Sequence, residues 1–159
     1  MNIKIICIGT LKEKYWKEAV SEYSKRLSPY CSLKIIELKE VKLPANVSNA
    51  DEKNVLIEEG SAIIKTINKT DFVIALDIIG KRFTSESLAK KISDLGVKGN
   101  SEISFVIGGS IGLSQEVLER ANLRMSFSDM TFPHQMMRVL LLEQIYRAYK
   151  IQRNEPYHK

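Results

Sequence analysis

The chain has 159 residues, of which 44% are hydrophobic and 27% are charged, and this balance predicts one globular domain over residues 1–159. Two cysteines are too few for a disulfide framework, and two histidines with two separated cysteines provide no metal-ligand spacing, so we expect no metal. The formal net charge of +5 is compatible with a polyanionic partner such as nucleic acid.

The first predicted strand covers residues 3–9, with the sequence IKIICIG. Its apolar run is too short for a signal peptide, and no small-residue cleavage site follows it. No apolar segment approaches the roughly 20 residues that span a bilayer. We therefore expect a cytoplasmic protein that has no membrane partner.

Helical and strand patterns alternate along the rest of the chain. Apolar residues at helical spacing predict helices over 16–27, 56–67 and 88–95. Ser48 and Asp51 form a capping pair that opens the second helix, while Thr84 and Gly96 suit the two ends of the third. Further strands are predicted at 33–38, 71–77, 103–108 and, with a weaker pattern, 123–128.

The strands at 71–77 and 103–108 are continuous apolar runs, which is typical of strands buried on both faces of a parallel sheet. The alternation of strands and helices indicates an α/β fold with a mostly parallel sheet flanked by helices. The sequence contains no repeat and no composition shift that would indicate a second domain.

The last predicted helix, roughly 133–152, is apolar on nearly all sides except for a thin polar stripe. Thr131 is its predicted N-cap, and Pro133 suits its first turn. A helix with so much apolar surface is buried on several sides. In a chain of this size we expect the excess apolar surface to contact a second subunit, in a C2 homodimer.

A glycine-rich loop follows the strand at 103–108 and satisfies the nucleophile-elbow pattern G-x-S-x-G at 108–112. Ser110 would then be the nucleophile of a serine hydrolase, and Asp129 and His134 follow it in the hydrolase chain order. Against this, Ser114 is the better helix N-cap, and Asp129 lies only five residues before His134, so a shared triad geometry is awkward. The loop could instead be a simple turn, or its backbone could contact a ligand, because glycine lets a ligand approach the main chain closely.

Several segments together resemble one family along the whole chain. They are LDIIGK (76–81), FVIGGSIGL (105–113), SFSDMTFPHQMMRVLLLEQIYRAYKI (126–151) and the terminal PYHK. This family is the ribosomal RNA large subunit methyltransferase H family, small SPOUT-class enzymes that methylate N3 of a pseudouridine in 23S ribosomal RNA. The resemblance implies a C-terminal trefoil knot, which is a rare exception to the rule against threaded chains. It also implies a homodimer that uses S-adenosylmethionine and acts on the large ribosomal subunit or the whole ribosome.

The resemblance also implies which residues contact S-adenosylmethionine. They are Leu76, Gly108, Phe127, Ser128, Asp129, Met130, Thr131 and Phe132. Leu76, Met130 and Phe132 would supply apolar walls, although Met130 and Phe132 could equally be ordinary core residues. Asp129 is expected to contact the cofactor through its backbone.

Methylation of a ring nitrogen that carries a proton requires a group that accepts this proton. The candidates are His134, for which a structural role is the favoured alternative, and His158. A helix N-terminus disfavours imidazolium, so His134 would tend to be neutral. The resemblance places Tyr157 and His158, with Arg147, on the RNA side of the site, and the partner subunit could supply them.

The C-terminal region is rich in basic residues, which could either form a solvated helix face or contact phosphates. These residues are Arg138, Arg147, Lys150, Arg153 and Lys159. A second hypothesis from another class is a non-catalytic RNA-binding or ribosome-assembly factor. The intact glycine loop and the segment 131–134 favour the enzyme, because a factor that only binds RNA would not require them.

Overall fold

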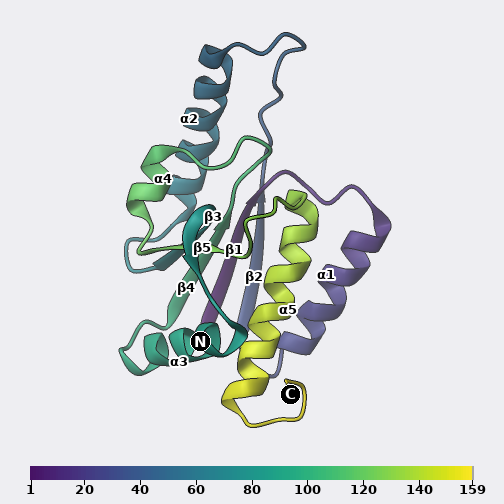
Figure 1. The fold of residues 1–159 in the computed structure, drawn as a ribbon, viewed down its shortest axis with the longest axis vertical. Helices are drawn as coiled ribbons and strands as arrows, with labels where there is room; N and C mark the ends of the chain where they lie inside the picture. Colours follow the sequence, from purple (N-terminus) through teal and green to yellow (C-terminus); the bar gives the residue numbers. More distant parts are fainter. Residues whose placement is uncertain (159) are drawn as a thin grey trace.

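A parallel sheet forms the centre of the molecule in the computed structural model, which describes residues 1–158 (Figure 1). Its strands are β1 (Asn2–Ile8), β2 (Ser32–Leu38), β3 (Phe72–Arg82), β4 (Glu102–Ile107) and β5 (Leu123–Ser126). The strand order is β2-β1-β4-β3-β5, and every neighbouring pair is parallel. The predicted α/β class with a parallel sheet is therefore confirmed.

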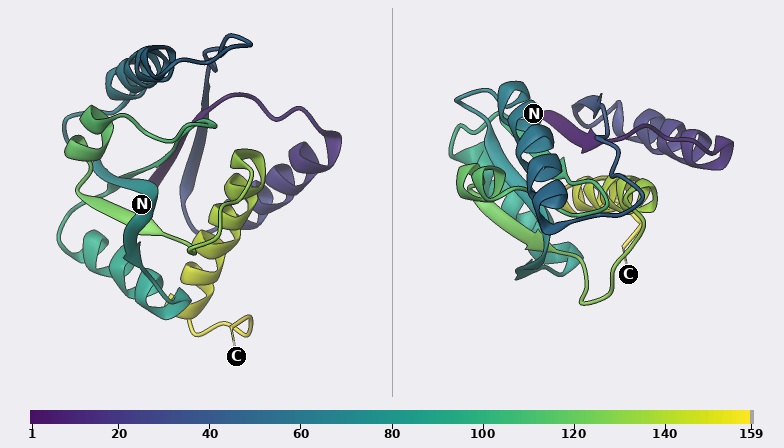
Figure 2. Two further views of the ribbon diagram at one scale, coloured as in Figure 1. Left: turned by 45° about the horizontal axis from the view of Figure 1, so that its top comes forward. Right: turned by 90° about the horizontal axis from the view of Figure 1, so that it is seen from above.

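Five helices cover the sheet in the described part of the chain. They are α1 (Lys14–Leu27), α2 (Asn49–Thr66), α3 (Ser85–Val97), α4 (Gln115–Arg120) and α5 (His134–Gln152). Figure 2 shows α2 and α4 on one face of the sheet and α1 and α5 on the other, and α5 also packs against α3. No helix within residues 1–158 is both long enough and apolar enough to cross a membrane.

The alternation of side chains along β1 explains why all of its residues from Ile5 to Ile8 are apolar and buried. Ile3, Ile5 and Cys7 face the larger core, which contains the buried residues of α3 and α5. Ile6 and Ile8 face a smaller core that lies against α2 and α4. Successive residues of a strand point to opposite faces, so a strand covered on both faces needs an apolar residue at nearly every position.

The helix starts follow the predicted caps, except in α5. Ser48 and Asp51 form a reciprocal capping box, and Ser114 caps α4 by accepting a hydrogen bond from Val117 N–H. The prediction that Thr131 caps α5 is wrong. Pro133 is the N-cap and makes no side-chain capping bond, because the preceding segment passes over a cavity and places Thr131 two residues too early.

The end of α3 also differs from the prediction. Thr84 caps α3 as expected, but Gly96 does not end this helix, which continues to Val97. The chain turns instead at Gly99, whose φ of +82° is readily adopted only by glycine.

β3 extends to Arg82, well beyond the predicted end at residue 77, because it resumes pairing with β5 after an irregularity. The register shifts between Leu76 and Lys81, and the intervening Ile78 and Ile79 are exposed. Gly80 allows this close return, since a Cβ there would lie 2.7 Å from the carbonyl carbon of Arg124. The bulge sets two apolar side chains beside the carboxyl end of the sheet.

Candidate functional site

A cavity of about 380 Å³ lies where β3, β4 and β5 end and α5 begins. This is the edge at which open parallel sheets bind ligands, because the loops that follow the strands meet there. The lining residues are Leu76, Asp77, Ile78, Ile107, Gly108, Gly109, Ser110, Gly112, Met125, Ser126, Phe127, Ser128, Met130, Thr131, Phe132, Pro133, His134 and Met137.

The glycine loop after β4 forms one wall of the cavity and folds back tightly on itself. Gly112 N–H donates to the carbonyl of Gly109 at 3.2 Å, and the φ of Gly112 is +89°. A Cβ on Gly108 would lie only 2.4 Å from the carbonyl oxygen of Gly112. No side chain therefore fits at Gly108 unless the loop opens.

Glu59 of α2 supports this loop from behind, and sequence analysis did not identify it. Its side chain is buried, and its Oε1 accepts a hydrogen bond of 3.0 Å from the backbone N–H of Val41. Its Oε2 has no partner and lies 3.0 Å from the position that a Cβ on Gly109 would occupy. Burial raises the pKa of Glu59, which favours an uncharged carboxyl behind the loop.

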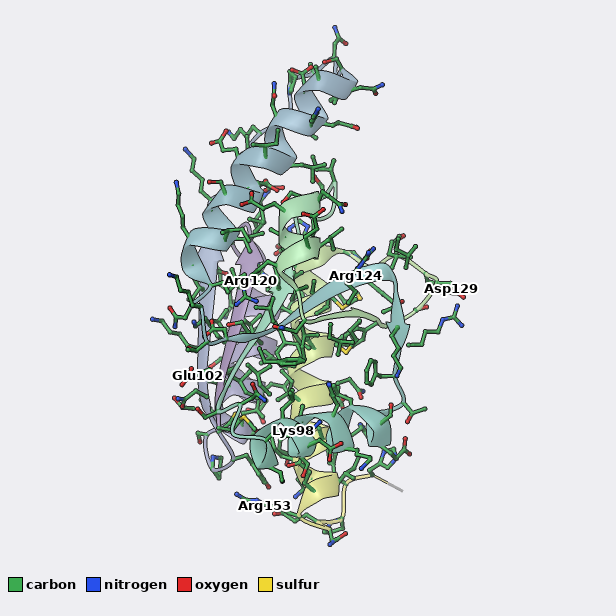
Figure 3. The ribbon with its side chains drawn as sticks, turned by 90° about the vertical axis from the view of Figure 1, so that its left-hand side faces the viewer. Lys98, Glu102, Arg120, Arg124, Asp129 and Arg153 are labelled. Atoms are coloured by element: carbon green, nitrogen blue, oxygen red, sulfur yellow. The ribbon has the colours of Figure 1, made fainter. Side chains whose placement is uncertain are left out.

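The structure brings together seven of the eight residues that the resemblance placed against the cofactor: all of them except Asp129 line the cavity. The Asp129 side chain is exposed and forms an ion pair with Arg82. Figure 3 shows Asp129 at the outer end of its loop, away from the sheet. A backbone contact at this residue stays a prediction.

Asp77 and His134 are the only titratable residues that line the cavity in the described part of the chain. Asp77 accepts a hydrogen bond of 2.7 Å from Nε of Arg124 and forms an ion pair with that guanidinium. No lysine or arginine lines the cavity within residues 1–158, so the site suits a neutral or cationic ligand. Asp77 follows Leu76 directly in the LDIIGK segment, and its place at a strand end was a signal that could have identified it.

Arg138 holds the first turn of α5 against the end of β1. Its guanidinium donates to the carbonyls of Ile8 at 3.0 Å and Gly9 at 2.6 Å and pairs with Glu37 at 2.6 Å. The side chain is 1% exposed. The idea that Arg138 contacts phosphate is therefore wrong, because the residue is part of the core. Lys159, named with it, lies outside the described residues.

The three residues predicted on the RNA side of the site lie around the other end of α5. Arg147 pairs with Glu143, and the Tyr157 hydroxyl donates to the same carboxylate at 3.2 Å. His158 lies 3.3 Å from Arg147 and 2.6 Å from Glu86, atom to atom. Figure 1 places the C-terminus at the end of α5 opposite its first turn.

The C-terminal cluster lies far from the cavity of the same chain. Arg147 follows His134 by 13 positions in α5, which corresponds to roughly 20 Å along the helix axis. Within one protomer, the tail and the cavity therefore form two separate clusters.

The structure does not form the hydrolase triad. Ser110 and His134 both line the cavity, but no hydrogen bond joins them within residues 1–158. Asp129 is paired with Arg82 and so does not orient His134. The glycine loop instead presents backbone groups to the cavity.

Comparison with known proteins identifies a family and several full-length relatives. A family model described as "Predicted SPOUT methyltransferase" matches residues 1–158. The ribosomal RNA large subunit methyltransferase H of Clostridium novyi is 62% identical over 159 residues, covering 100% of both chains. The protein of the same name from Clostridioides difficile is 57% identical, and a putative one from Methanococcus maripaludis is 54% identical, each again over 100% of both chains.

Proposed function

Because the chain belongs to the ribosomal RNA large subunit methyltransferase H family of SPOUT methyltransferases, we propose that it methylates N3 of a pseudouridine in 23S ribosomal RNA with S-adenosylmethionine as methyl donor. The observation that carries the proposal is the cavity at the carboxyl end of the sheet. Its walls combine the glycine loop, Leu76 and the segment 127–132, which are the segments that the family resemblance assigns to the cofactor.

The residues of the cavity fit this cofactor. Its volume of about 380 Å³ lies within the usual range of small-molecule sites. Leu76, Met130 and Phe132 supply apolar surface for a purine ring, and the glycine loop supplies backbone hydrogen-bonding groups. The Asp77 carboxylate and the lack of lining cations within residues 1–158 suit a positively charged sulfonium. When bound, S-adenosylmethionine supplies an electrophilic methyl group.

The protein contributes alignment and exclusion of water, which account for much of the catalysis of an in-line displacement. The tight glycine loop fixes one wall, and α5 fixes another through Arg138. Three of the lining apolar side chains, Ile78, Met130 and Phe132, are also exposed, so part of the apolar wall is open to solvent.

We further infer that the active form is a homodimer in which the tail of one subunit reaches the cavity of the other. Tyr157, His158 and Arg147 lie far from the cavity of their own chain, so only a partner could bring them to it. The proposal also includes a single domain over the whole chain and the trefoil knot of the family. We also expect the assembled ribosome to supply specificity for one nucleotide.

The first test is cofactor binding followed by methyl transfer. We expect saturable binding of S-adenosylmethionine to the purified protein by calorimetry, and transfer of its labelled methyl group to ribosomes that lack this modification. Nuclease digestion and mass spectrometry should locate the label at N3 of a pseudouridine in 23S RNA. Ribosome binding without methyl transfer would contradict the enzyme and favour an RNA-binding factor.

The second test addresses the tail. We expect Gly108→Ala homodimers to be inactive because they lack the cofactor, and His158→Ala homodimers to be strongly impaired because their tail is defective. A doubly tagged heterodimer of the two variants should recover about half of the wild-type activity, because one of its two composite sites is intact. An inactive heterodimer would show that the tail serves its own subunit.

A further inference from the structure

We propose that His134 is the catalytic base that accepts the N3 proton of the target nucleobase, an inference that rests on the methyl transfer proposed above. The imide nitrogen carries a hydrogen, and this hydrogen must leave for a neutral N-methyl product to form. The base must therefore lie at the cavity and be unprotonated at neutral pH.

Among the residues that line the cavity, His134 is the best candidate for this base. The cavity is also lined by hydroxyl groups, which do not take up a proton at neutral pH; they belong to Ser110, Ser126, Ser128 and Thr131. The Asp77 carboxylate is bound by the Arg124 guanidinium and directed toward β5. His134 is the other titratable group that lines the cavity within residues 1–158.

Both ring nitrogens of His134 are available to form hydrogen bonds with a ligand. No hydrogen bond to either ring nitrogen forms among residues 1–158, although neighbouring Gln135 accepts one of 2.9 Å from the backbone N–H of Lys12. The residue is half-buried at the first position of α5. A half-buried imidazole with no protein partner at a cavity wall is free to bond to a ligand.

The surroundings of His134 favour its neutral form. Burial lowers the pKa of His134, and the positive charges of Arg138 and Lys12 add to this effect, while the carboxylate of Glu40 opposes it. The helix N-terminus acts in the same direction as burial. Glu37 compensates part of the Arg138 charge through their ion pair. A neutral ring at pH 7 can accept a proton without first losing one.

The structure also fixes where this ring lies. Arg138, one turn further along α5, is bonded to the end of β1 and so anchors the first turn of the helix. Nε2 of His134 lies beside the end of β1, because a Cβ built on Gly9 would be in ordinary contact with it at 3.6 Å and equally close to Oε2 of Glu40. Because Arg138 holds the first turn of α5 in place, the His134 ring is held in a defined position, which proton transfer requires.

The step balances with the reactants already named. The N3–H bond breaks and its proton passes to a ring nitrogen of His134. The N3 electron pair forms the bond to the methyl carbon, and the electron pair of the broken carbon–sulfur bond stays on the sulfur. The products are the N3-methylated base, the thioether and an imidazolium, which returns its proton to water.

The test compares single-turnover rates of wild type, His134→Gln and His158→Gln across pH. We expect the wild-type rate to rise as pH increases through a midpoint below 6.5, the usual imidazole value. His134→Gln should lose about 100-fold in rate and should lose this acid limb, while its cofactor affinity by calorimetry stays unchanged. His158→Gln is the matched control, which should lower the rate but keep the acid limb.

Three outcomes would overturn the assignment: an acid limb that persists in His134→Gln, a rate close to wild type, or loss of cofactor binding in that variant. An NMR titration of the His134 ring gives a second readout that needs no turnover, and a pKa above 6.5 would also contradict it. If the wild-type protein itself does not methylate pseudouridine, it is the proposed function that fails, and this result is distinct from the others.

Discussion

Replacing Arg138 with methionine is expected to lower the free energy of unfolding by about 3 kcal/mol, because the variant leaves buried groups without partners. The guanidinium is 1% exposed and serves two backbone carbonyls at the end of β1 as well as Glu37. Methionine fills much of the same space but donates no hydrogen bond. The carbonyls of Ile8 and Gly9 would then lose their charged donor in the interior.

The matched control is Arg26→Met, which removes an exposed i,i+4 pair with Glu22. This variant should leave the urea unfolding midpoint close to that of wild type, because exposed pairs contribute little. Arg138→Met should also weaken cofactor binding, since the first turn of α5 is a wall of the cavity. Equal effects of the two variants on the midpoint would contradict the anchoring role of Arg138.

Arg138 also shows what the sequence could and could not predict. It lies three, four and seven residues before Leu141, Leu142 and Ile145, so helical spacing places it on the buried face of α5. Glu59 lies four residues after Val55 and four residues before Ile63, on the buried face of α2. The charge of Arg138 was taken as a sign of an exposed helix face or a phosphate contact, although its position in the apolar stripe was the stronger signal.

The strands were predictable because burial on both faces leaves β1 and β4 largely apolar. Their ends were harder to predict when tertiary contacts decided them. β3 continues past residue 77 because Gly80 lies against the backbone of β5, and the last two residues of β5 already line the cavity. No local pattern specifies either contact.

The candidate site was also only partly predictable from the sequence. The cavity-lining segments follow strands in the sequence, and the carboxyl ends of parallel strands meet, so their convergence follows from the fold class. The place of the tail does not, because a terminal segment with a Tyr and a His can pack wherever its aromatic and charged partners lie. In one protomer these partners are Glu143, Arg147 and Glu86.

Gly108→Ala is expected to abolish cofactor binding, with an affinity loss of about 100-fold or more, which corresponds to roughly 3 kcal/mol. The added methyl group would lie 2.4 Å from the carbonyl oxygen of Gly112 and 2.7 Å from its carbonyl carbon. Both atoms belong to the backbone of the same tight turn, so a rotamer change cannot relieve the overlap. The turn must open, and its backbone groups then no longer face the cavity.

Two further glycines make this prediction specific. At Gly109 the added carbon would meet the side chains of Glu59 at 3.0 Å and Ile8 at 3.2 Å, which can each shift slightly, so Gly109→Ala should weaken binding less than Gly108→Ala. At Gly96, in α3, it would meet only the terminal methyl of Met1 at 3.0 Å, so Gly96→Ala should bind as wild type does. Calorimetric titration of the three variants with S-adenosylmethionine should therefore rank them in the order of these contacts. Wild-type affinity in Gly108→Ala would mean that cofactor binding does not depend on the glycine loop. This result would contradict the assignment of the cavity as the binding site.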